Sequence, residues 1–578
     1  MGLVPRHNLP LTNDMTNKKI NKLRLYIAIQ RFRQIDRVNL ASYICLIIIV
    51  GIYAYIQITN FNPAYLEVDP DGYLLLAKRI AEFKPLAVKD DDHFMYQSHV
   101  WVENKEGEVA PKFAPGYPAL MSIAYLLGGD TAMFFVSPIM GGLALIGSFL
   151  LFRMWMSRAS ALFGVFYLAI NAMVLVYCNY LLTHASDLCF AVWGMFFLWR
   201  WKRGLGRFSG TLAGLLLGGA VTIRHTSALL ALVLIATVTA RWIECFKSKC
   251  SKKHLLKDTI ILIASYSIFP IILAIYDWTI FDSPFVTGYA LSGEQNAFNL
   301  KNIPQNARIL ATGMNYTALF LLFPIGLAGM FLALAIGESV MVSLWVISLF
   351  LLYSSYYWAP NGMAYFRFLI ATFPAIVGSG FALMDKASAS WIRKTVVYSL
   401  LLGFLIFVTY WDTRSAVEGV VSSYPSLSLA YSAKRTAKIL NDDAVIFSQW
   451  PAFCYIGTRR HFRHYDLNIF TASYGASSFT ENTEPKRQPI RNDRLRAFYK
   501  GLSDADLQKK KVELIRNFLS DGRQVSYLLP QYAIKGEQNA IGKEFRWNLL
   551  DNWICYTKND NGIWQGEIWE LYEIARES

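Results

Sequence analysis

Long apolar runs separated by short charged loops are the feature that most constrains the fold of this chain. A helix needs about 20 apolar residues to cross roughly 30 Å of hydrocarbon. Runs of this kind recur between Leu40 and Trp411, and 54% of the residues are hydrophobic whereas 17% are charged. Because lipid cannot satisfy backbone polar groups, such runs predict membrane-spanning helices. We therefore expect a polytopic α-helical membrane protein.

About eleven spans are predicted from the apolar runs and the helix length that the bilayer requires. They cover approximately residues 40–58, 131–152, 159–178, 188–201, 209–223, 227–240, 259–280, 312–336, 340–358, 366–384 and 396–411. The run 117–127 is too short to span, so it predicts an interfacial or re-entrant helix.

The distribution of positive charge predicts the orientation. Cytoplasmic loops of membrane proteins carry an excess of Lys and Arg. The segment before Leu40 has eight Lys/Arg against two Asp, and every second loop after it is again basic, with one exception at Gly337 and Glu338. The net charge of +15 is thus explained by topology, and nucleic acid is not an expected partner. Residues 1–39 are expected to be a cytoplasmic basic N-terminus, in a multi-pass protein of the cell inner membrane.

Three regions follow from this topology. Residues 40–411 form a transmembrane module whose first external loop, 59–130, is long and polar. Residues 412–578 are mixed and polar, with strand-like runs at 444–448, 525–529 and 568–572 and a helical run at 503–519. After about eleven crossings the chain lies outside, so this part is expected to be a soluble α/β extracytoplasmic domain.

The first external loop carries the residues that best suit chemistry. It begins E-V-D-P-D-G-Y, with Asp69 and Asp71, and it ends P-K-F-A-P-G-Y-P-A-L-M, with Lys112. A carboxylate can act as a general base, and a lysine can hold an anion. The alternative is structural, because D-P-D-G also suits a turn in which Asp and Pro fix the shape and Gly72 supplies a permissive backbone.

Other ionisable and aromatic side chains collect on the same predicted side of the membrane. Ionisable groups near the bilayer are costly, so their presence suggests function. For Arg224, the first of the candidates, the alternative is an arginine that snorkels at a hairpin tip. The candidates that would join the two carboxylates and Lys112 in binding a substrate are Arg224, His225, Asp187, Tyr289, Tyr365 and Arg367, with His184 and Glu294 nearby.

This set suits the transfer of a group from a lipid-linked phosphate. Such transfer needs one base to take the proton of the acceptor and cations to hold the departing phosphate. Phosphate leaves as a stabilised anion, so no general acid is obligatory. Asp69 or Asp71 would be the base, and Lys112, Arg224 and Arg367 the phosphate clamp, in which Arg offers a bidentate fork.

The order of these motifs resembles the GT-C superfamily of integral-membrane glycosyltransferases, and most of all the branch of protein O-mannosyltransferases and lipid A aminoarabinose transferases. The resemblance rests on D-P-D-G-Y-L-L-L-A-K-R-I, then K-F-A-P-G-Y-P-A-L-M, and covers about residues 40–411. It implies a polyprenyl-phosphate sugar donor, inversion of the anomeric centre and an essential Asp in the first external loop.

By this resemblance the family's Asp and aromatic residue fall on Asp69 and Tyr73, with Asp71 as the alternate. The family's lysine falls on Lys112, which would contact the donor phosphate. The segment A-Y-F-R-F-L-I-A-T-F-P places the family's later arginine at Arg367. Two departures bear on the subfamily, namely Pro70 after Asp69, and Phe113 and Ala114 where a double proline is common.

The sequence therefore predicts a glycosyltransferase that acts on a lipid, glycan or protein acceptor among membrane lipids. A polytopic lipid or glycan transporter and a non-catalytic lipid-binding assembly subunit are the alternatives. No spacing of Cys and His fits a zinc site. No cofactor is certain, and a divalent metal stays open because members of the superfamily differ in this respect.

Overall fold

The computed structural model describes residues 37–61, 69–89, 100–104, 106–206, 208–248, 251–357, 359, 362–387, 396, 398–400, 403, 407, 435–441, 443–448, 463–470, 499–558 and 564–576. Nearly all of the predicted N-terminus 1–39 lies outside these residues. The last predicted span, 396–411, is described at only a few positions, and the side chain of Asp71 is not described.

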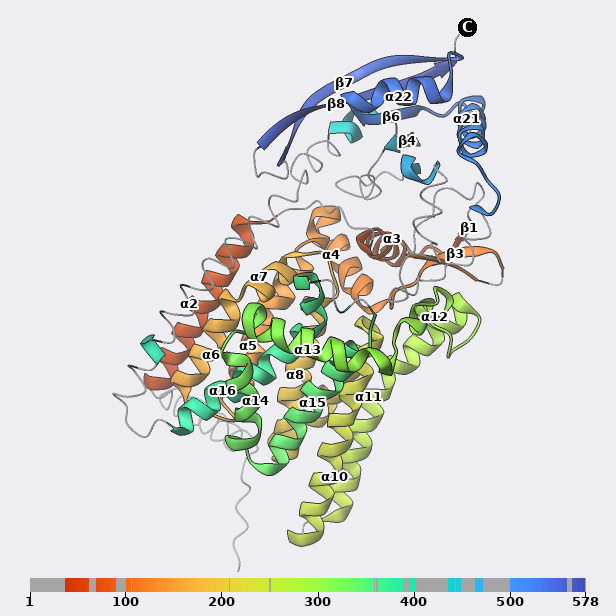
Figure 1. Ribbon diagram of the computed structural model, residues 1–578. Helices are drawn as coiled ribbons and strands as arrows, with labels where there is room; N and C mark the ends of the chain where they lie inside the picture. Colours follow the sequence, from red (N-terminus) through yellow and green to blue (C-terminus); the bar gives the residue numbers. More distant parts are fainter. Residues whose placement is uncertain are drawn as a thin grey trace, which may run out of the picture.

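A bundle of apolar helices makes up most of the described chain (Figure 1). Its main members are α2 (Arg37–Thr59), α5 (Val136–Phe152), α6 (Arg158–Ile170), α8 (His184–Lys202), α9 (Ser209–Ile223), α10 (Leu230–Ser248), α11 (Lys252–Phe281), α14 (Leu322–Leu332), α15 (Ile336–Ser354) and α16 (Phe373–Ala387). Among the described residues, 5 helices are long and apolar enough to cross a membrane, or up to 8 if each bent pair is one span. The chain is thus a multi-pass membrane protein, while the predicted count of eleven is not confirmed.

Three helix pairs are bent. Two of the bends fall within the predicted spans 159–178 and 312–336, whereas the kink at Gly128 and Gly129 falls between the run 117–127 and the span 131–152, which the sequence predicts as separate elements. Helix α4 (Gly116–Met133) meets α5 at 108°, and α6 meets α7 (Ala172–Asn179) at 57°. The segment of α13 (Ile303–Gly313) and η4 (Met314–Ala318) meets α14 at 110°. The local causes are visible in the backbone, since Gly129 has φ 71°, Phe320 has φ 51°, and the Asn171 side chain caps α7. Hydropathy does not report such bends.

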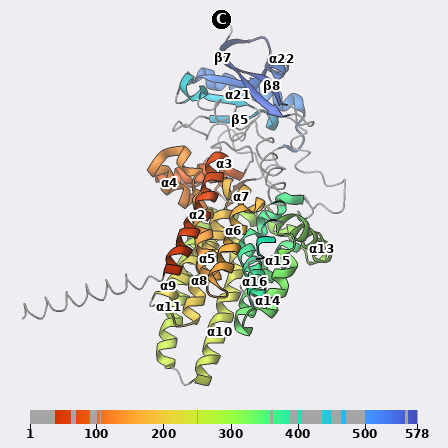
Figure 2. The same ribbon diagram turned by 90° about the vertical axis from the view of Figure 1, so that its left-hand side faces the viewer.

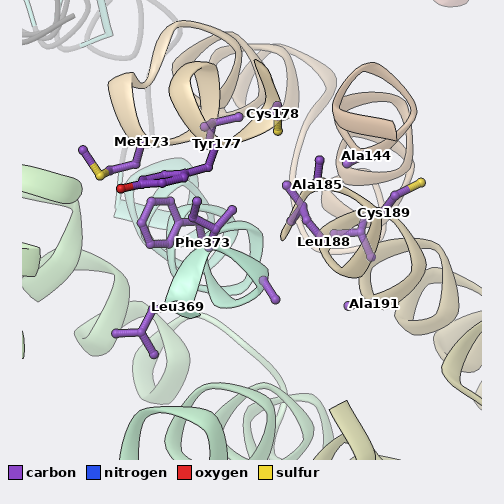
Figure 3. Close-up of a cluster of buried hydrophobic side chains, with 14 of the residues drawn as sticks. Ala144, Met173, Tyr177, Cys178, Ala185, Leu188, Cys189, Ala191, Leu369 and Phe373 are labelled. Carbon is purple, nitrogen blue, oxygen red and sulfur yellow. The ribbon is translucent and has the colours of Figure 1, made fainter. Parts of the chain in front are cut away.

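Close packing holds the bundle together. A Cβ on Gly218 of α9 would lie 2.2 Å from the Tyr266 carbonyl oxygen of α11, so the two backbones touch where no side chain intervenes. Small residues allow this approach in membrane helices. Elsewhere larger side chains fill the space, as around Tyr177, Leu369 and Phe373 in Figure 3. Helices α10 and α11 extend past the other helices at one end (Figure 1).

The described part of the segment 59–130 forms two helices and a small sheet at the other end of the bundle (Figures 1 and 2). Helix α3 (Asp69–Ala81) packs on α4, and the segment between them forms a three-stranded antiparallel sheet in the order β1-β3-β2. The strands are β1 (Val88–Lys89), β2 (Trp101–Glu103) and β3 (Glu108–Pro111). The short apolar run at 117–127 lies within α4, as predicted for a helix.

The C-terminal region is an α/β unit that lies beyond α3 and α4 in both views (Figures 1 and 2). Its five-stranded sheet has the order β5-β4-β6-β8-β7, in which β4 pairs in parallel with β5 and β6, and β8 is antiparallel to both neighbours. Its elements are β4 (Val445–Ser448), β5 (Arg463–Asp466), α21 (Asp504–Ser520), β6 (Val525–Pro530), α22 (Gln531–Ile541), β7 (Phe545–Lys558) and β8 (Trp564–Arg576). The predicted strands and the predicted helix 503–519 are confirmed.

Candidate active site

The motif D-P-D-G forms the first turn of α3 and not a separate turn. Asp69 is the first residue of the helix, and Pro70 follows in the first turn, where its missing N–H costs nothing. A Cβ on Gly72 would lie 2.8 Å from Val100 and 2.9 Å from Phe113, so only glycine lets this turn approach the end of β3 so closely. The helix start that carries Asp69 therefore lies against the segment that carries Lys112.

Tyr73 lies one turn after Asp69 and is buried among aromatic rings. Its ring centroid is 4.2 Å from that of Phe113 and 5.3 Å from that of Tyr117. Burial raises the pKa of Tyr73 well above its ordinary value, and the Asp69 carboxylate raises it further, whereas Arg224 and Arg367 oppose the rise. The phenol of Tyr73 therefore stays protonated. The charges of Asp69, Arg224 and Arg367 all act on it, so these side chains surround Tyr73.

Lys112 follows β3 directly and is 4% exposed. Its Nζ lies 2.6 Å from Glu294 Oε2, and the Tyr356 hydroxyl donates to Glu294 Oε1 at 2.7 Å. Glu294 begins η2 (Glu294–Ala297), and Tyr356 follows α15. Three segments distant in sequence therefore meet at the carboxylate of Glu294.

Arg224 caps the C-terminal end of α9 and is tied to the start of α8 and the end of α15. It donates to His184 Nδ1 at 2.6 Å and to the Tyr353 hydroxyl at 2.7 Å, and its Nε lies 3.9 Å from Asp187 Oδ2. Since guanidinium has no acceptor, His184 must accept at Nδ1 and carry its proton on Nε2. The Asp187 carboxylate also accepts from Ser227. These contacts fix the guanidinium group of Arg224 in one orientation.

His225 and Tyr289 face each other between these groups. Their ring centroids are 5.7 Å apart, edge to face. Both ring nitrogens of His225 are buried and make no hydrogen bond within the described part of the chain. Tyr289 belongs to α12 (Gly288–Leu291), and burial raises its pKa, with Tyr73, Glu294 and Asp69 adding to the rise. The phenol of Tyr289 is therefore a neutral donor on which the carboxylates of Glu294 and Asp69 both act.

The two predicted residues of η5 (Gly362–Thr372) differ in their roles. Tyr365 is fully buried and donates its hydroxyl proton to the Tyr353 carbonyl oxygen at 2.6 Å, so it supports the end of α15. The guanidinium of Arg367 lies over the Phe368 ring at 5.2 Å and acts on the phenol of Tyr73. Arg367 is therefore one of the charged residues around Tyr73, whereas Tyr365 supports the backbone at the end of α15.

Sequence reasoning did not single out Tyr353 and Tyr356. They occur at the end of an apolar span, in L-L-Y-S-S-Y-Y-W-A-P-N, where six polar or aromatic residues come just before Ala-Pro. Tyrosine is common at the membrane interface, so this pattern by itself predicts no site. The structure gives these residues their importance by placing them against Arg224 and Glu294.

The assembled group offers carboxylates, cations and several neutral donors at one end of the bundle. Asp69 is the candidate base, Lys112 and Arg224 are cations held by the contacts described above, and the neutral donors include Tyr73 and Tyr289. Such a set can accept a proton and stabilise an anion. Within the described part of the chain, no three or more His, Cys, Asp and Glu side chains gather in a way suited to a metal ion.

Comparison with known proteins gives the fold class. No protein-family model matches the sequence, and no curated protein matches it. Its structural neighbours are GT-C glycosyltransferases, as the sequence motifs predicted. ArnT from Cupriavidus metallidurans, solved bound to undecaprenyl phosphate, is 10% identical with a TM-score of 0.54, and the match covers 91% of this chain and 97% of that one. The protein thus shares the ArnT fold over almost the whole of both chains.

Two further solved structures match less well. The archaeal oligosaccharyltransferase AglB from Archaeoglobus fulgidus, in complex with an inhibitory peptide and a dolichol-phosphate, is 13% identical with a TM-score of 0.48, and the match covers 91% of this chain and 74% of that one. The S. cerevisiae Pmt1-Pmt2 O-mannosyltransferase complex, bound to the sugar donor, is 14% identical with a TM-score of 0.31. This match covers 46% of this chain and 36% of that one.

Proposed function

We propose that the protein is a glycosyltransferase that moves a sugar from a polyprenyl-phosphate-linked donor to an acceptor on the extracytoplasmic side of the membrane. The observation that carries the proposal is the convergence of Asp69, Lys112 and Arg224 at one end of the bundle, in a chain with the fold of ArnT. ArnT was solved with undecaprenyl phosphate, which is the product that such a donor leaves behind.

In the proposed reaction Asp69 takes the proton from the acceptor hydroxyl or amine. The acceptor atom forms a bond to the anomeric carbon of the sugar while the bond from that carbon to the phosphate oxygen breaks. The electron pair stays on the phosphate oxygen, where Lys112 and the fork of Arg224 stabilise the new charge. A single displacement from the face opposite the phosphate inverts the anomeric centre.

Asp69 is assigned as the base because it matches the family motif best and because it starts α3. Its charge acts on Tyr73 and Tyr289, on which the charge of Arg224 also acts. His225, Tyr289 and Arg367 would bind the substrates, and Asp187 would position Arg224.

The test is transfer by membranes that contain the full chain. Membranes are supplied with a panel of polyprenyl-phosphate sugars and cell-envelope extract as the acceptor, and the release of polyprenyl phosphate is measured. Asp69→Asn is expected to lower the rate by about 10²-fold to 10⁴-fold, the usual contribution of a general base. Glu106→Gln, on the exposed β2–β3 turn of the same loop, is the control and should keep the full rate.

Two results would contradict the proposal. Full activity of Asp69→Asn would remove its assigned role, and Asp71→Asn would then be compared in the same assay. Absence of transfer by the unmodified chain with every donor, together with movement of lipid between leaflets in vesicles, would favour the transporter alternative.

A further inference from the structure

Lys112 already has an anionic partner. Its ammonium lies 2.6 Å from Glu294, and both side chains are largely withdrawn from solvent, at 4% and 15% exposed. The proposed function assigns the same ammonium to the phosphate of the donor. A carboxylate of this chain therefore occupies a position next to the atom that the phosphate would contact.

Glu294 is held in this position from two sides. The Tyr356 hydroxyl donates to its second carboxylate oxygen at 2.7 Å. On the other side, a Cβ on Gly288 would lie 2.3 Å from the Lys112 Cα, so the segment that leads to Glu294 packs directly on the lysine backbone. The Tyr289 ring in the same segment lies 5.4 Å from Lys112 Nζ. The pair is thus part of the packed fold and not a chance surface contact.

The charge of the phosphate changes during the proposed reaction, whereas that of Glu294 does not. In the donor, the phosphate is a diester with one negative charge. Once the bond to the anomeric carbon breaks, the electron pair stays on the phosphate oxygen, and a monoester carries about −1.5 to −2 charges at pH 7. Lys112 therefore attracts the product phosphate more strongly than the donor phosphate, because the Coulomb energy scales with charge, and the product is the form more prone to be retained.

We infer that Glu294 is an internal competitor for Lys112 that opposes retention of the product and so helps polyprenyl phosphate to leave the site. This inference rests on the proposed function, in which Lys112 binds the phosphate. Glu294 shares the ammonium with the donor, yields it as the second charge develops, and pairs with it again when polyprenyl phosphate leaves. Because Lys112 pairs with Glu294 again once the phosphate is gone, the product leaves more easily than it would from a lysine without a carboxylate partner.

A purely structural role for Glu294 predicts the opposite sign. If the carboxylate only holds Lys112 in place, removing its charge lets the ammonium move and weakens phosphate binding. If it competes, removing its charge frees the ammonium and tightens binding. The sign of one affinity change therefore separates the two roles.

The experiment measures undecaprenyl phosphate binding to the purified full chain in detergent. Glu294→Gln keeps the shape of the side chain and removes its charge, and is expected to bind about tenfold more tightly, a modest coupling for a close charge pair. The gain should shrink at high salt. Tyr356→Phe is the matched control, because it removes the other contact of Glu294 but keeps the carboxylate, and it should bind within about threefold of the unmodified chain.

Turnover gives a second readout. With its product held more tightly, Glu294→Gln should lose rate in multiple turnovers relative to a single turnover, and added undecaprenyl phosphate should inhibit it at lower concentration. Glu294→Asp keeps the charge but shortens the side chain. Its turnover and its inhibition by undecaprenyl phosphate should lie between those of the unmodified chain and those of Glu294→Gln. These variants are compared only after their melting temperatures show that they fold.

The outcomes distinguish the inference from the function on which it rests. Unchanged binding by Lys112→Gln would overturn the proposed phosphate contact and the inference with it. Weaker binding by Lys112→Gln, together with weaker or unchanged binding by Glu294→Gln, would overturn the inference alone. Equal tightening by Tyr356→Phe and Glu294→Gln would also overturn it, because loosening of the segment and not loss of charge would then be the cause.

Discussion

The ammonium of Lys78 and the carboxylate of Asp130 form an ion pair at 2.5 Å, and 5% of each side chain is exposed. The pair joins α3 to the last turn of α4, just after the break at Gly129, where φ is 71°. The Tyr125 ring also lies 5.8 Å from the Lys78 ammonium. The helix that begins with Asp69 is therefore fixed to α4 at its opposite end.

Breaking this pair should destabilise the protein. In Asp130→Asn the buried ammonium of Lys78 loses its counter-charge, which typically costs about 3–5 kcal/mol. The apparent melting temperature of the full chain in detergent should fall clearly. Lys84→Gln is the control, because the Lys84–Glu82 pair is 45% and 23% exposed and should contribute only about 0–1 kcal/mol. Equal shifts for both variants would show that the burial of the first pair has no consequence.

Gly288→Ala should disturb the site without touching a charged group. The added methyl group would lie 2.3 Å from the Lys112 Cα and 2.5 Å from its carbonyl oxygen, so α12 must move away. We expect about a tenfold loss of transfer rate and about 1–3 kcal/mol of stability from the overpacking. Gly536→Ala, on α22, has nothing within 4 Å and should leave the transfer rate unchanged. An unaffected rate in Gly288→Ala would mean that the position of Lys112 does not matter.

Arg224→Lys should impair transfer although it keeps the charge. The guanidinium contacts His184, Asp187 and Tyr353 with different nitrogens, and an ammonium cannot reproduce this fork. We expect the transfer rate at low donor concentration to fall about 10-fold to 100-fold, since one or two charge-assisted hydrogen bonds are lost.

The control for Arg224→Lys is Arg203→Lys. Arg203 directly follows α8 and pairs with Glu338, a full helix length from the His184 end. Its replacement should leave transfer within about twofold of the unmodified chain, as expected for a partly exposed pair. A comparable loss in both variants would point to a general effect on the bundle.

Ser503→Ala should loosen α21 in the C-terminal domain. The Ser503 side chain accepts from the Asp506 backbone N–H, and the Asp506 side chain accepts from the Ser503 backbone N–H. Loss of such a cap typically costs about 1 kcal/mol. Hydrogen exchange of the first turn of α21 in the full chain should become about fivefold faster, whereas Ser520→Ala at the other end should leave that turn unchanged. No acceleration would mean that the cap does not limit opening of the helix.

Helix and strand content could be predicted where the pattern is strong. The strand runs at 444–448 and 525–529 and the helix at 503–519 have clear periodicity and agree with β4, β6 and α21. The bends within the predicted spans 159–178 and 312–336 could not be predicted, because they depend on the backbone conformation of single residues such as Phe320. A hydropathy window averages over such residues, so a bent pair and a straight span look alike.

The sequence by itself determined the class of protein and the identity of its charged candidates. Apolar runs of membrane length leave helices as the means of burying the backbone, and an ionisable residue at the end of such a run is visible without a structure. Only the tertiary structure decided which of these residues meet. It brings Glu294 to Lys112 and Tyr356 to Glu294, from 182 and 62 positions away in sequence, and it turns Tyr365 toward the Tyr353 carbonyl oxygen. Such contacts depend on helix packing across the whole bundle, which no local pattern records.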